Sequence, residues 1–137
     1  MRFVDTNVLL YAASTSRKER KKAERARALL DADDLALSVQ VLQELYVQAT
    51  RPTRSERLSH EQASLLIEAL LRFPVQETTV ALMKAALATK ERFGISYWDA
   101  TILEAARALG CSVVLSEDLN DGQNYGNVTV ENPFAGL

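Results

Sequence analysis

The chain has very little of several residue types, and each shortage excludes a class of protein. Its 137 residues include one cysteine, Cys111, so no disulfide can form within the chain, and a reducing cytosol fits best. No uninterrupted apolar run approaches the roughly 20 residues that cross a bilayer. Residues 1–12 are too short for a secretory signal and are interrupted by Asp5 and Asn7. We therefore expect a cytoplasmic protein without a membrane anchor.

Histidine and tryptophan also occur only once each. His60 lies at the start of a predicted helix, far in sequence from every acidic motif, so we expect a structural or solvated role rather than general-base catalysis. Trp98 is interpreted as a core residue rather than a base-stacking platform. Cys111 precedes an apolar strand and is expected to be a small core residue.

The composition is that of an ordinary globular protein, with 47% hydrophobic and 25% charged residues. There is no internal repeat, linker or low-complexity segment, so residues 1–137 are expected to form a single domain. Apolar runs and helix-boundary residues predict alternating strands and helices. Strands are predicted at residues 3–4, 35–37, near 75, 112–115 and 128–130, and helices at residues 6–13, 17–32, 39–49, 60–73, 79–92 and 97–109. Short apolar strands between helices indicate an α/β fold with a parallel sheet covered on both faces.

Four well-separated acids lie where predicted elements begin or end: Asp5, Glu44, Asp99 and Asp118. Acids at the carboxyl ends of parallel strands and at neighbouring helix starts can converge on one cleft. Like charges there repel unless a cation or protons compensate. The arrangement therefore predicts a site for a hard divalent metal, although Asp5 also suits a helix cap, Asp118 a turn, and Glu44 a solvated helix boundary.

Asp99 is the most informative of these acids. The helical period places it between Trp98, Ile102 and Leu103, on the face that should pack against the sheet. A buried carboxylate needs a compensating partner. A capping box with Ser96 is the rival interpretation, and both roles are compatible.

The net charge of −2 indicates no overall nucleic-acid surface, but basic residues are concentrated in two stretches. Residues 17–27 contain seven bases and two acids, a local charge of +5, and residues 51–57 contain three arginines. Two interpretations stay open: solvated surfaces, or surfaces that bind phosphates beside an acidic cleft. The residues predicted to make these phosphate contacts are Lys18, Lys21, Arg25, Arg51 and Arg54.

Five segments, in order along the chain, resemble the motifs of PIN-domain ribonucleases, and among these the VapC-type toxins of toxin–antitoxin pairs. They are Phe3–Leu9 (FVDTNVL), Gln43–Glu44, Tyr97–Ala100 (YWDA), Leu115–Leu119 (LSEDL) and Asn132–Phe134. The resemblance implies a three-layer α/β/α sandwich around a mainly parallel sheet. It also implies Mg²⁺ or Mn²⁺ bound by the four acids, an RNA substrate, an antitoxin partner and a homodimer formed through residues 39–72.

Supporting residues follow from the same resemblance. Thr6 and Asn7 match the hydroxyl and polar pair after the first acid. Ser116 stands where the family often has threonine and keeps the hydroxyl. Asp121 is a second acid near the fourth motif and leaves the outermost ligand open.

The implied reaction is metal-dependent cleavage of an RNA phosphodiester bond, the activity of a type II toxin. Asp5 and Asp99 are expected to be inner metal ligands, with Glu44 and Asp118 holding waters or a second ion. Two other classes of similar architecture fit less well. A receiver-type signalling domain needs adjacent acids after its first strand, and a haloacid-dehalogenase-like phosphatase needs an aspartate where Asn7 stands. The alternative is a binding module whose acidic cleft captures a partner's arginine without cleaving RNA.

Overall fold

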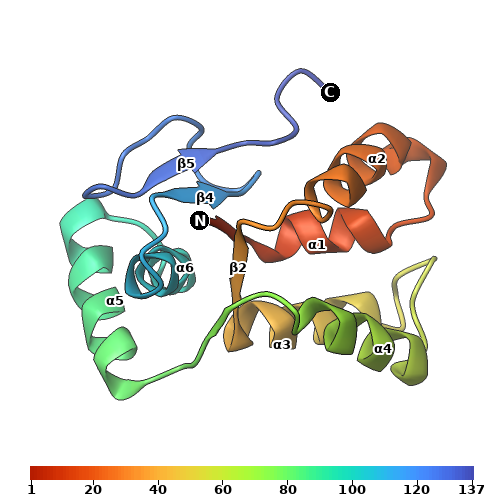
Figure 1. Cartoon of the computed structure of the whole chain (residues 1–137), viewed down its shortest axis with the longest axis horizontal. Helices are drawn as coiled ribbons and strands as arrows, with labels where there is room; N and C mark the ends of the chain where they lie inside the picture. The colour runs from red at the N-terminus through yellow and green to blue at the C-terminus, as the bar shows by residue number, and fades with distance from the viewer.

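The computed structural model describes residues 1–137 and contains five strands, six α-helices and one short 3-10 helix (Figure 1). In chain order these are β1 (Arg2–Val4), α1 (Thr6–Ala13), η1 (Arg17–Glu19), α2 (Arg20–Leu29), β2 (Leu35–Ser38), α3 (Val39–Ala49), α4 (His60–Leu70), β3 (Val75–Gln76), α5 (Val80–Phe93), α6 (Tyr97–Ala108), β4 (Val113–Leu115) and β5 (Thr129–Glu131). None of the helices combines the length and apolar character required to span a membrane.

The strands form one sheet in the order β3-β2-β1-β4-β5, and every pair in it is parallel. The chain first builds outward from β1 through β2 to β3, then returns to the other side of β1 to add β4 and β5. The connection after β1 leads to β2 on one side, and the connection after β4 leads to β5 on the other side. The connections that follow these two neighbouring strands therefore run in opposite directions across the sheet. In open α/β sheets, ligands bind beside the carboxyl ends of such a strand pair.

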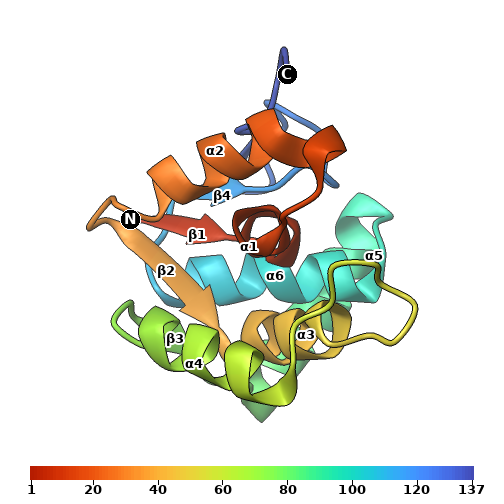
Figure 2. The same ribbon diagram turned by 90° about the vertical axis from the view of Figure 1, so that its right-hand side faces the viewer.

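Helices cover both faces of the sheet, which confirms the expected three-layer α/β/α sandwich. Helices α1 to α4 lie on one side of the strands and α5 with α6 on the other (Figure 1). This division follows from right-handed crossovers, because connections that build outward in opposite directions place their helices on opposite faces. Viewed from the α1–α4 side, the β1 arrow points to α1 and the β2 arrow runs obliquely toward α3 (Figure 2). All four residues of β2 are buried, as expected for a strand covered on both faces.

Side-chain caps fix where the helices start. Ser38, Thr79 and Ser96 each accept a hydrogen bond from a backbone N–H in the first turn of the helix that follows. Ser59 and Gln62 complete a reciprocal capping box at the start of α4. Helix α5 ends at Gly94, which has φ 65°.

The charged helix predicted over residues 17–32 is shorter than expected. Its first residues form a 3-10 turn, Arg17–Glu19, and the α-helix spans Arg20–Leu29. Neither Ser16 nor Glu19 provides a side-chain cap, and a run of basic residues at the helix start opposes the helix dipole. Asp31, Asp33 and Asp34 follow the other end of the helix, where their negative charges are unfavourable beside the negative end of the helix dipole.

The prediction that Trp98 belongs to the core is wrong, since 63% of this residue is exposed. Ala100 and Leu103, further along α6, are fully buried against the sheet. The helical period correctly places Ile102, Leu103 and Ala106 on the inward stripe, but Trp98, the second residue of α6, lies at the exposed N-terminal end of the helix. Cys111 is buried, as expected.

Gly94→Ala should lower the free energy of unfolding by about 1 kcal/mol, because a Cβ is unfavourable at positive φ. A Cβ at this position meets no other atom within 4 Å, so the backbone conformation alone accounts for the loss. Urea denaturation measures the change. Gly94→Asn serves as the control, since asparagine tolerates this conformation better, and equal stability of the alanine variant and the wild type would contradict the prediction.

Candidate active site

Four acids from four separate segments line one small cavity at the carboxyl ends of β1 and β4. The cavity has a volume of about 120 Å³. The residues that line it are Asp5, Thr6, Asn7, Leu10, Glu44, Gln48, Trp98, Asp99, Ile102 and Asp118. Residues up to 113 positions apart in sequence thus meet at the strand pair where the sheet order reverses.

Asp5 is held in place by the pairing of β1 with β4. The parallel register continues past the strands, and the backbone N–H of Asp5 donates to the carbonyl of Leu115 at 3.0 Å. This contact places Asp5 beside Ser116, whose hydroxyl donates to Asp5 Oδ2 at 2.8 Å. The other carboxylate oxygen, Oδ1, accepts the backbone N–H of Thr6 at 2.7 Å and caps α1. The helix-cap interpretation of Asp5 is therefore correct, and it coexists with a place in the cavity.

Asp5 is also the acid with the most unfavourable electrostatic environment. Burial is the largest cause that raises its pKa, to about 6 from an ordinary 3.8, and the charges of Asp118 and Glu44 raise it further. The hydrogen bonds from Ser116 and Thr6 act in the opposite direction and only partly compensate. Burial and neighbouring acids therefore favour a proton, or another positive charge, at this carboxylate.

Glu44 is tied to the first motif through Thr6. The Thr6 hydroxyl donates to Glu44 Oε2 at 2.8 Å, and Gln40, one turn earlier in α3, donates to Oε1 at 3.1 Å. These two bonds hold a half-buried carboxylate toward the cavity rather than in solvent.

Asn7 links the first and fourth motifs. Its side-chain amide donates to Asp118 Oδ2 at 3.1 Å and lies 3.4 Å from both Asp5 Oδ2 and Ser116 Oγ. Its carbonyl oxygen accepts the backbone N–H of Glu117 at 3.2 Å. The Asp118 backbone N–H donates to Ser116 Oγ at 3.1 Å, which closes the turn after β4. Thr6, Asn7 and Ser116 thus supply the hydrogen bonds that orient the carboxylates.

Asp99 differs from the other three acids because its carboxylate accepts no hydrogen bond from the chain. Its backbone N–H donates to Ser96 Oγ at 3.0 Å, which starts α6, but no reciprocal bond completes a capping box. The side chain is half-buried rather than fully enclosed. It is therefore the acid in the cavity that is most available to a ligand.

Asp121 is not among the residues that line the cavity. Its Oδ1 accepts the backbone N–H of Asn132 at 2.9 Å and joins two turns near the C-terminus. Conversely, Gln48 and Trp98 line the cavity although the sequence did not indicate them as site residues. Gln48 lies one turn after Glu44, and this i, i+4 spacing was the available signal.

Glu117, between Ser116 and Asp118, also makes contacts that were not expected. It accepts hydrogen bonds from the Tyr11 hydroxyl at 2.7 Å and from Lys22 Nζ at 2.5 Å. The pairing with Lys22 and the bond from Tyr11 oppose the effect of burial and lower the pKa of Glu117. This network joins α1 and α2 to the segment that carries Asp118.

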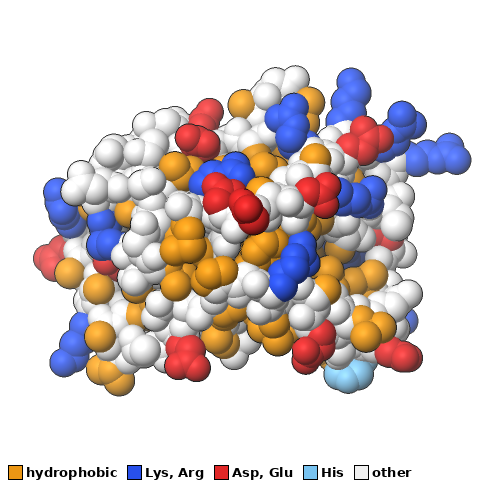
Figure 3. Space-filling view, in the orientation of Figure 1, with side chains coloured by type: hydrophobic (Ala, Val, Ile, Leu, Met, Phe, Trp, Pro, Cys, Tyr) orange, Lys and Arg blue, Asp and Glu red, His pale blue; other side chains and the backbone are white.

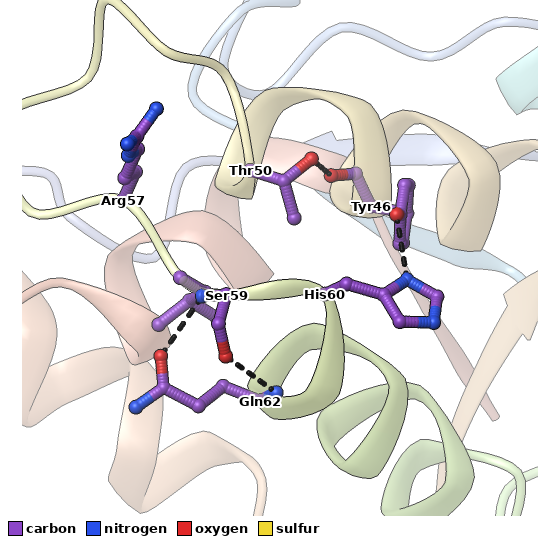
Figure 4. A pocket seen from close by; sticks show the side chains of 7 residues that line it. Tyr46, Thr50, Arg57, Ser59, His60 and Gln62 are labelled. Carbon is purple, nitrogen blue, oxygen red and sulfur yellow. Dashed lines mark hydrogen bonds between the residues drawn. The ribbon is translucent and has the colours of Figure 1, made fainter.

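His60 lies in a different pocket, on the opposite side of α3 from the acids. Its Nδ1 is 2.8 Å from the Tyr46 hydroxyl (Figure 4). This pocket, of about 550 Å³, is lined by Tyr46, Thr50, Arg57, Leu58, Ser59, His60 and Gln62. It is larger than the acidic cavity but contains no carboxylate. The structure therefore separates His60 from the acids, as the sequence predicts.

The two basic stretches meet at the end of α1. Lys18 and Lys21 line an exposed hollow with Arg17, Arg20, Lys22 and Leu137, and Lys and Arg side chains gather at the upper right of Figure 3, over the start of α2. The loop after α3 lies near the same end of α1, and the Ser14 hydroxyl donates to Glu56 there. Within that loop Arg51 is exposed, whereas Arg54 pairs with Glu56 at 3.4 Å.

Arg25, the fifth residue predicted to bind RNA, has a structural contact of its own. It is exposed, but one of its guanidinium nitrogens donates to the carbonyl of Pro133 at 2.7 Å. The acids lie around the first turn of α1, so its eight residues put the basic end of this helix about 12 Å from the cavity.

The donor set of the cavity suits a hard cation such as Mg²⁺ or Mn²⁺. Every acidic ligand candidate is an oxygen donor, and no three acidic, histidine or cysteine side chains lie close enough together to ligate one ion. Mg²⁺ meets this constraint, since it binds proteins through one or two carboxylates and keeps several waters. Asp5 Oδ1 accepts only the Thr6 N–H and retains a second lone pair, and the Asp99 carboxylate accepts no hydrogen bond from other side chains. The residues therefore fit a cation held by two carboxylates and water.

The sequence profile described as "PIN domain" matches residues 2–120. This match covers nearly the entire chain, with all four acids, and the chain belongs to the PIN domain family. No curated protein sequence matches it.

Solved structures with the same fold include three from toxin–antitoxin systems. A toxin–antitoxin complex from Klebsiella pneumoniae is 18% identical, with a TM-score of 0.71 over 98% of each chain. Mycobacterium tuberculosis VapC20, described as a sarcin-ricin loop cleaving toxin, is 20% identical, with a TM-score of 0.66 over 86% of this chain and 90% of that chain. DNA-bound VapBC from Salmonella typhimurium is 20% identical, with a TM-score of 0.64 over 96% and 97%. Identities this low show a shared fold.

Asp5→Asn should remove a pH dependence from the stability of the protein in chelator. The folded state holds the Asp5 proton up to about pH 6, whereas the unfolded chain releases it near pH 4. The free energy of unfolding of the wild type should therefore fall as pH rises from 4 to 6 and stay low above that range. Relative to the wild type, the variant should gain about 3 kcal/mol between pH 4 and pH 7.

Urea denaturation at several pH values measures this difference. Asp121→Asn is the matched control, because it removes a carboxylate outside the cavity and keeps an oxygen that can accept from Asn132. Parallel stability curves for the wild type and Asp5→Asn would contradict the assigned environment of Asp5.

Proposed function

We propose that this PIN domain is a Mg²⁺- or Mn²⁺-dependent endoribonuclease and the VapC-type toxin of a type II toxin–antitoxin system. The observation that carries the proposal is the convergence of Asp5, Glu44, Asp99 and Asp118 on one cavity at the switch point of the sheet. The neighbours in the comparison of solved structures support the biological role, since they are described as toxins or as complexes of toxins with antitoxins.

In this proposal the four acids have different roles. Asp5 and Asp99 bind the cation directly, because Asp5 is buried beside other acids and Asp99 has no competing hydrogen bond. Glu44 and Asp118 accept hydrogen bonds from water in the cavity and orient it toward the phosphate. Thr6, Asn7 and Ser116 hold these carboxylates in place. Asp121 acts only through the turn that it stabilises.

Phosphodiester hydrolysis places additional negative charge on a group that is already anionic. A bound divalent cation would lower the pKa of water and stabilise the developing charge. The protein contributes the positions of the acids. Asp5 lies at the start of α1, Glu44 within α3 and Asp99 in the first turn of α6. The strand pairing fixes Asp118 relative to Asp5 before substrate arrives, which limits the reorganisation required during the reaction.

The RNA strand would run from the acidic cavity along α1 toward the basic stretches. Lys18, Lys21 and Arg51 are exposed and suited to phosphate contacts. Arg25 and Arg54 already contact Pro133 and Glu56, so their contribution to RNA binding is smaller. Electrostatic attraction by this end of the molecule offsets the repulsion between RNA and a chain of net charge −2.

The partners and organisation of the protein form part of the same proposal. An antitoxin would block the cleft, and the protein would work in the cytoplasm as a single domain spanning residues 1–137. A homodimer through α3 and α4 is supported by an apolar hollow between these helices, lined by Val39, Leu42, Gln43, Tyr46, Val47, Ile67, Leu71 and Val75. Val47 and Leu71 are exposed in the isolated chain.

One other function has support from the same geometry. A half-buried carboxylate with no hydrogen-bond partner, Asp99, also suits the guanidinium group of a partner's arginine. A binding module of this kind would hold its partner without cleaving RNA. Cleavage of bare RNA that requires Mg²⁺ or Mn²⁺ and stops with chelator distinguishes the enzyme from the binding module.

Asp99→Asn should lower the rate of RNA cleavage at least about 100-fold, because the substitution removes a charged ligand while keeping the shape of the side chain. The measurement is a time course with a single-stranded RNA in Mg²⁺ or Mn²⁺, with thermal unfolding as a check on folding. Asp121→Asn is the control and should cleave like the wild type, since this acid lies outside the cavity. Unchanged cleavage by Asp99→Asn would refute the site assignment.

Replacing Lys18 and Lys21 together by glutamine should weaken RNA binding and flatten its salt dependence. Each single-strand phosphate contact contributes about 0.7 to the slope of log K against log salt, so losing two should reduce the slope by about 1.4. Fluorescence anisotropy of a labelled RNA at several salt concentrations measures the slope. Lys84 and Lys90 are exposed on α5, in the opposite layer, and their double glutamine variant is the control. Equal slopes for all three proteins would assign Lys18 and Lys21 to an ordinary solvated surface.

A further inference from the structure

The only tryptophan of the chain lies at the rim of the acidic cavity, where its indole contributes little to the core. Trp98 is the second residue of α6, lines the cavity beside Asp99 and is 63% exposed. Exposed indole is unfavourable in water, because Trp has one of the largest apolar surfaces of any side chain. The proposed reaction assigns this side chain no role.

The backbone that carries Trp98 is fixed before any ligand arrives. Ser96 caps the helix through the Asp99 backbone N–H at 3.0 Å, and the Thr101 hydroxyl donates to the Trp98 carbonyl at 2.5 Å. The neighbouring Tyr97 ring packs edge-to-face against the indole, with ring centroids 5.1 Å apart and an angle of 73° between the planes. A ring supported in this way loses little conformational freedom when a flat group stacks on it.

The surroundings of Trp98 favour one kind of ligand. The rest of the rim is mostly polar, and Leu10 and Ile102 are the only other apolar residues that line the cavity. An apolar helix of a partner protein needs a broad apolar surface, which this rim does not offer. A nucleobase requires only one flat aromatic face, and stacking accepts any base.

Position along the chain supports the same ligand. The Cα atoms of Trp98 and Asp99 are about 3.8 Å apart, as in any trans peptide. A phosphate that a cation holds beside the Asp99 carboxylate would therefore bring the base of an adjoining nucleotide within reach of the indole. The carboxylates would act on the phosphate while the neutral ring holds the base.

We propose that Trp98 is a base-stacking platform that binds the nucleobase adjoining the scissile phosphate of single-stranded RNA. The inference rests on the proposed ribonuclease function and adds to it a site for the base. Stacking sets the position of the strand in the cleft without selecting a base sequence, because every base has a face that can stack.

The single tryptophan provides a direct test in the wild-type protein. A short single-stranded RNA is titrated in low salt with Ca²⁺ in place of Mg²⁺, so that a cation can occupy the cavity while cleavage is slow, and binding is followed both by anisotropy of a label on the RNA and by indole fluorescence. We expect the fluorescence to change with the same midpoint as the anisotropy. The same RNA with abasic sites should bind through its phosphates without this change in fluorescence.

Variants separate stacking from a structural role. Trp98→Ala should weaken RNA binding about 5- to 150-fold, the range expected for one stacked base, and Trp98→Phe should retain part of the affinity. The salt slope should remain that of the wild type, because no phosphate contact is lost. Val80→Ala is the matched control, since Val80 lies in the first turn of α5, is 67% exposed and does not line the cavity.

The outcomes distinguish failure of this inference from failure of the proposed function. RNA binding without a change in indole fluorescence, with Trp98→Ala binding as well as the wild type, would overturn the inference and leave the ribonuclease intact. A change caused equally by abasic RNA would also overturn it, as would a change caused only by an arginine-rich peptide, which would assign Trp98 to a protein partner. No binding or cleavage of any RNA by the wild type would refute the function and the inference together.

Discussion

Burying a carboxylate beside other carboxylates is unfavourable, and the pairing of β1 with β4 is the interaction that keeps Asp5 in such a place. The backbone bond from Asp5 to Leu115 continues the ladder by one residue, and the Ser116 hydroxyl then meets the Asp5 side chain. Donors from Thr6 and Ser116 compensate only partly, so the pKa of Asp5 remains raised. The rest of the molecule provides the stability that offsets this local repulsion.

The cavity is arranged so that hydroxyl and amide groups, rather than basic residues, hold the acids. Thr6 bonds Glu44, Asn7 bonds Asp118, and Ser116 bonds Asp5. A lysine or arginine in these positions would neutralise the carboxylates and compete with a cation. Neutral donors fix the orientation of each acid and leave its charge available, which is the property that a divalent cation requires.

Positive charge is placed outside the cavity, and Lys22, the lysine that contacts the segment carrying Asp118, is paired with Glu117. Lys22 bonds Glu117 at 2.5 Å and lies 5.0 Å from the centre of the Tyr11 ring. The other bases of the same stretch stay at the surface. The molecule therefore separates an acidic cavity from a basic end by the length of α1, and this polarity can orient a nucleic acid strand.

Local patterns in the sequence were enough to predict the fold. Apolar runs such as Leu35–Leu37 predicted the strands. The helical period, together with boundary residues such as Ser96, predicted the helices. The main difference, the shorter helix α2, arises at a start without a cap, where propensity alone predicted too much helix. The motifs also identified all four acids that line the cavity.

The sequence by itself determined which residues have the chemistry of the site, because residue types and helix or strand periods are local properties. Only the tertiary structure decided which of them meet. The sequence named Asp118 as the fourth acid but left the outermost ligand open because of Asp121. In the structure the Asp118 side chain accepts from Asn7 at the cavity, whereas the Asp121 side chain accepts from the backbone of Asn132 outside it. Trp98 fits a core stripe by period, but it lies at the exposed N-terminal end of α6. Depth in the fold and contacts across strands depend on how distant segments pack, and no local pattern encodes them.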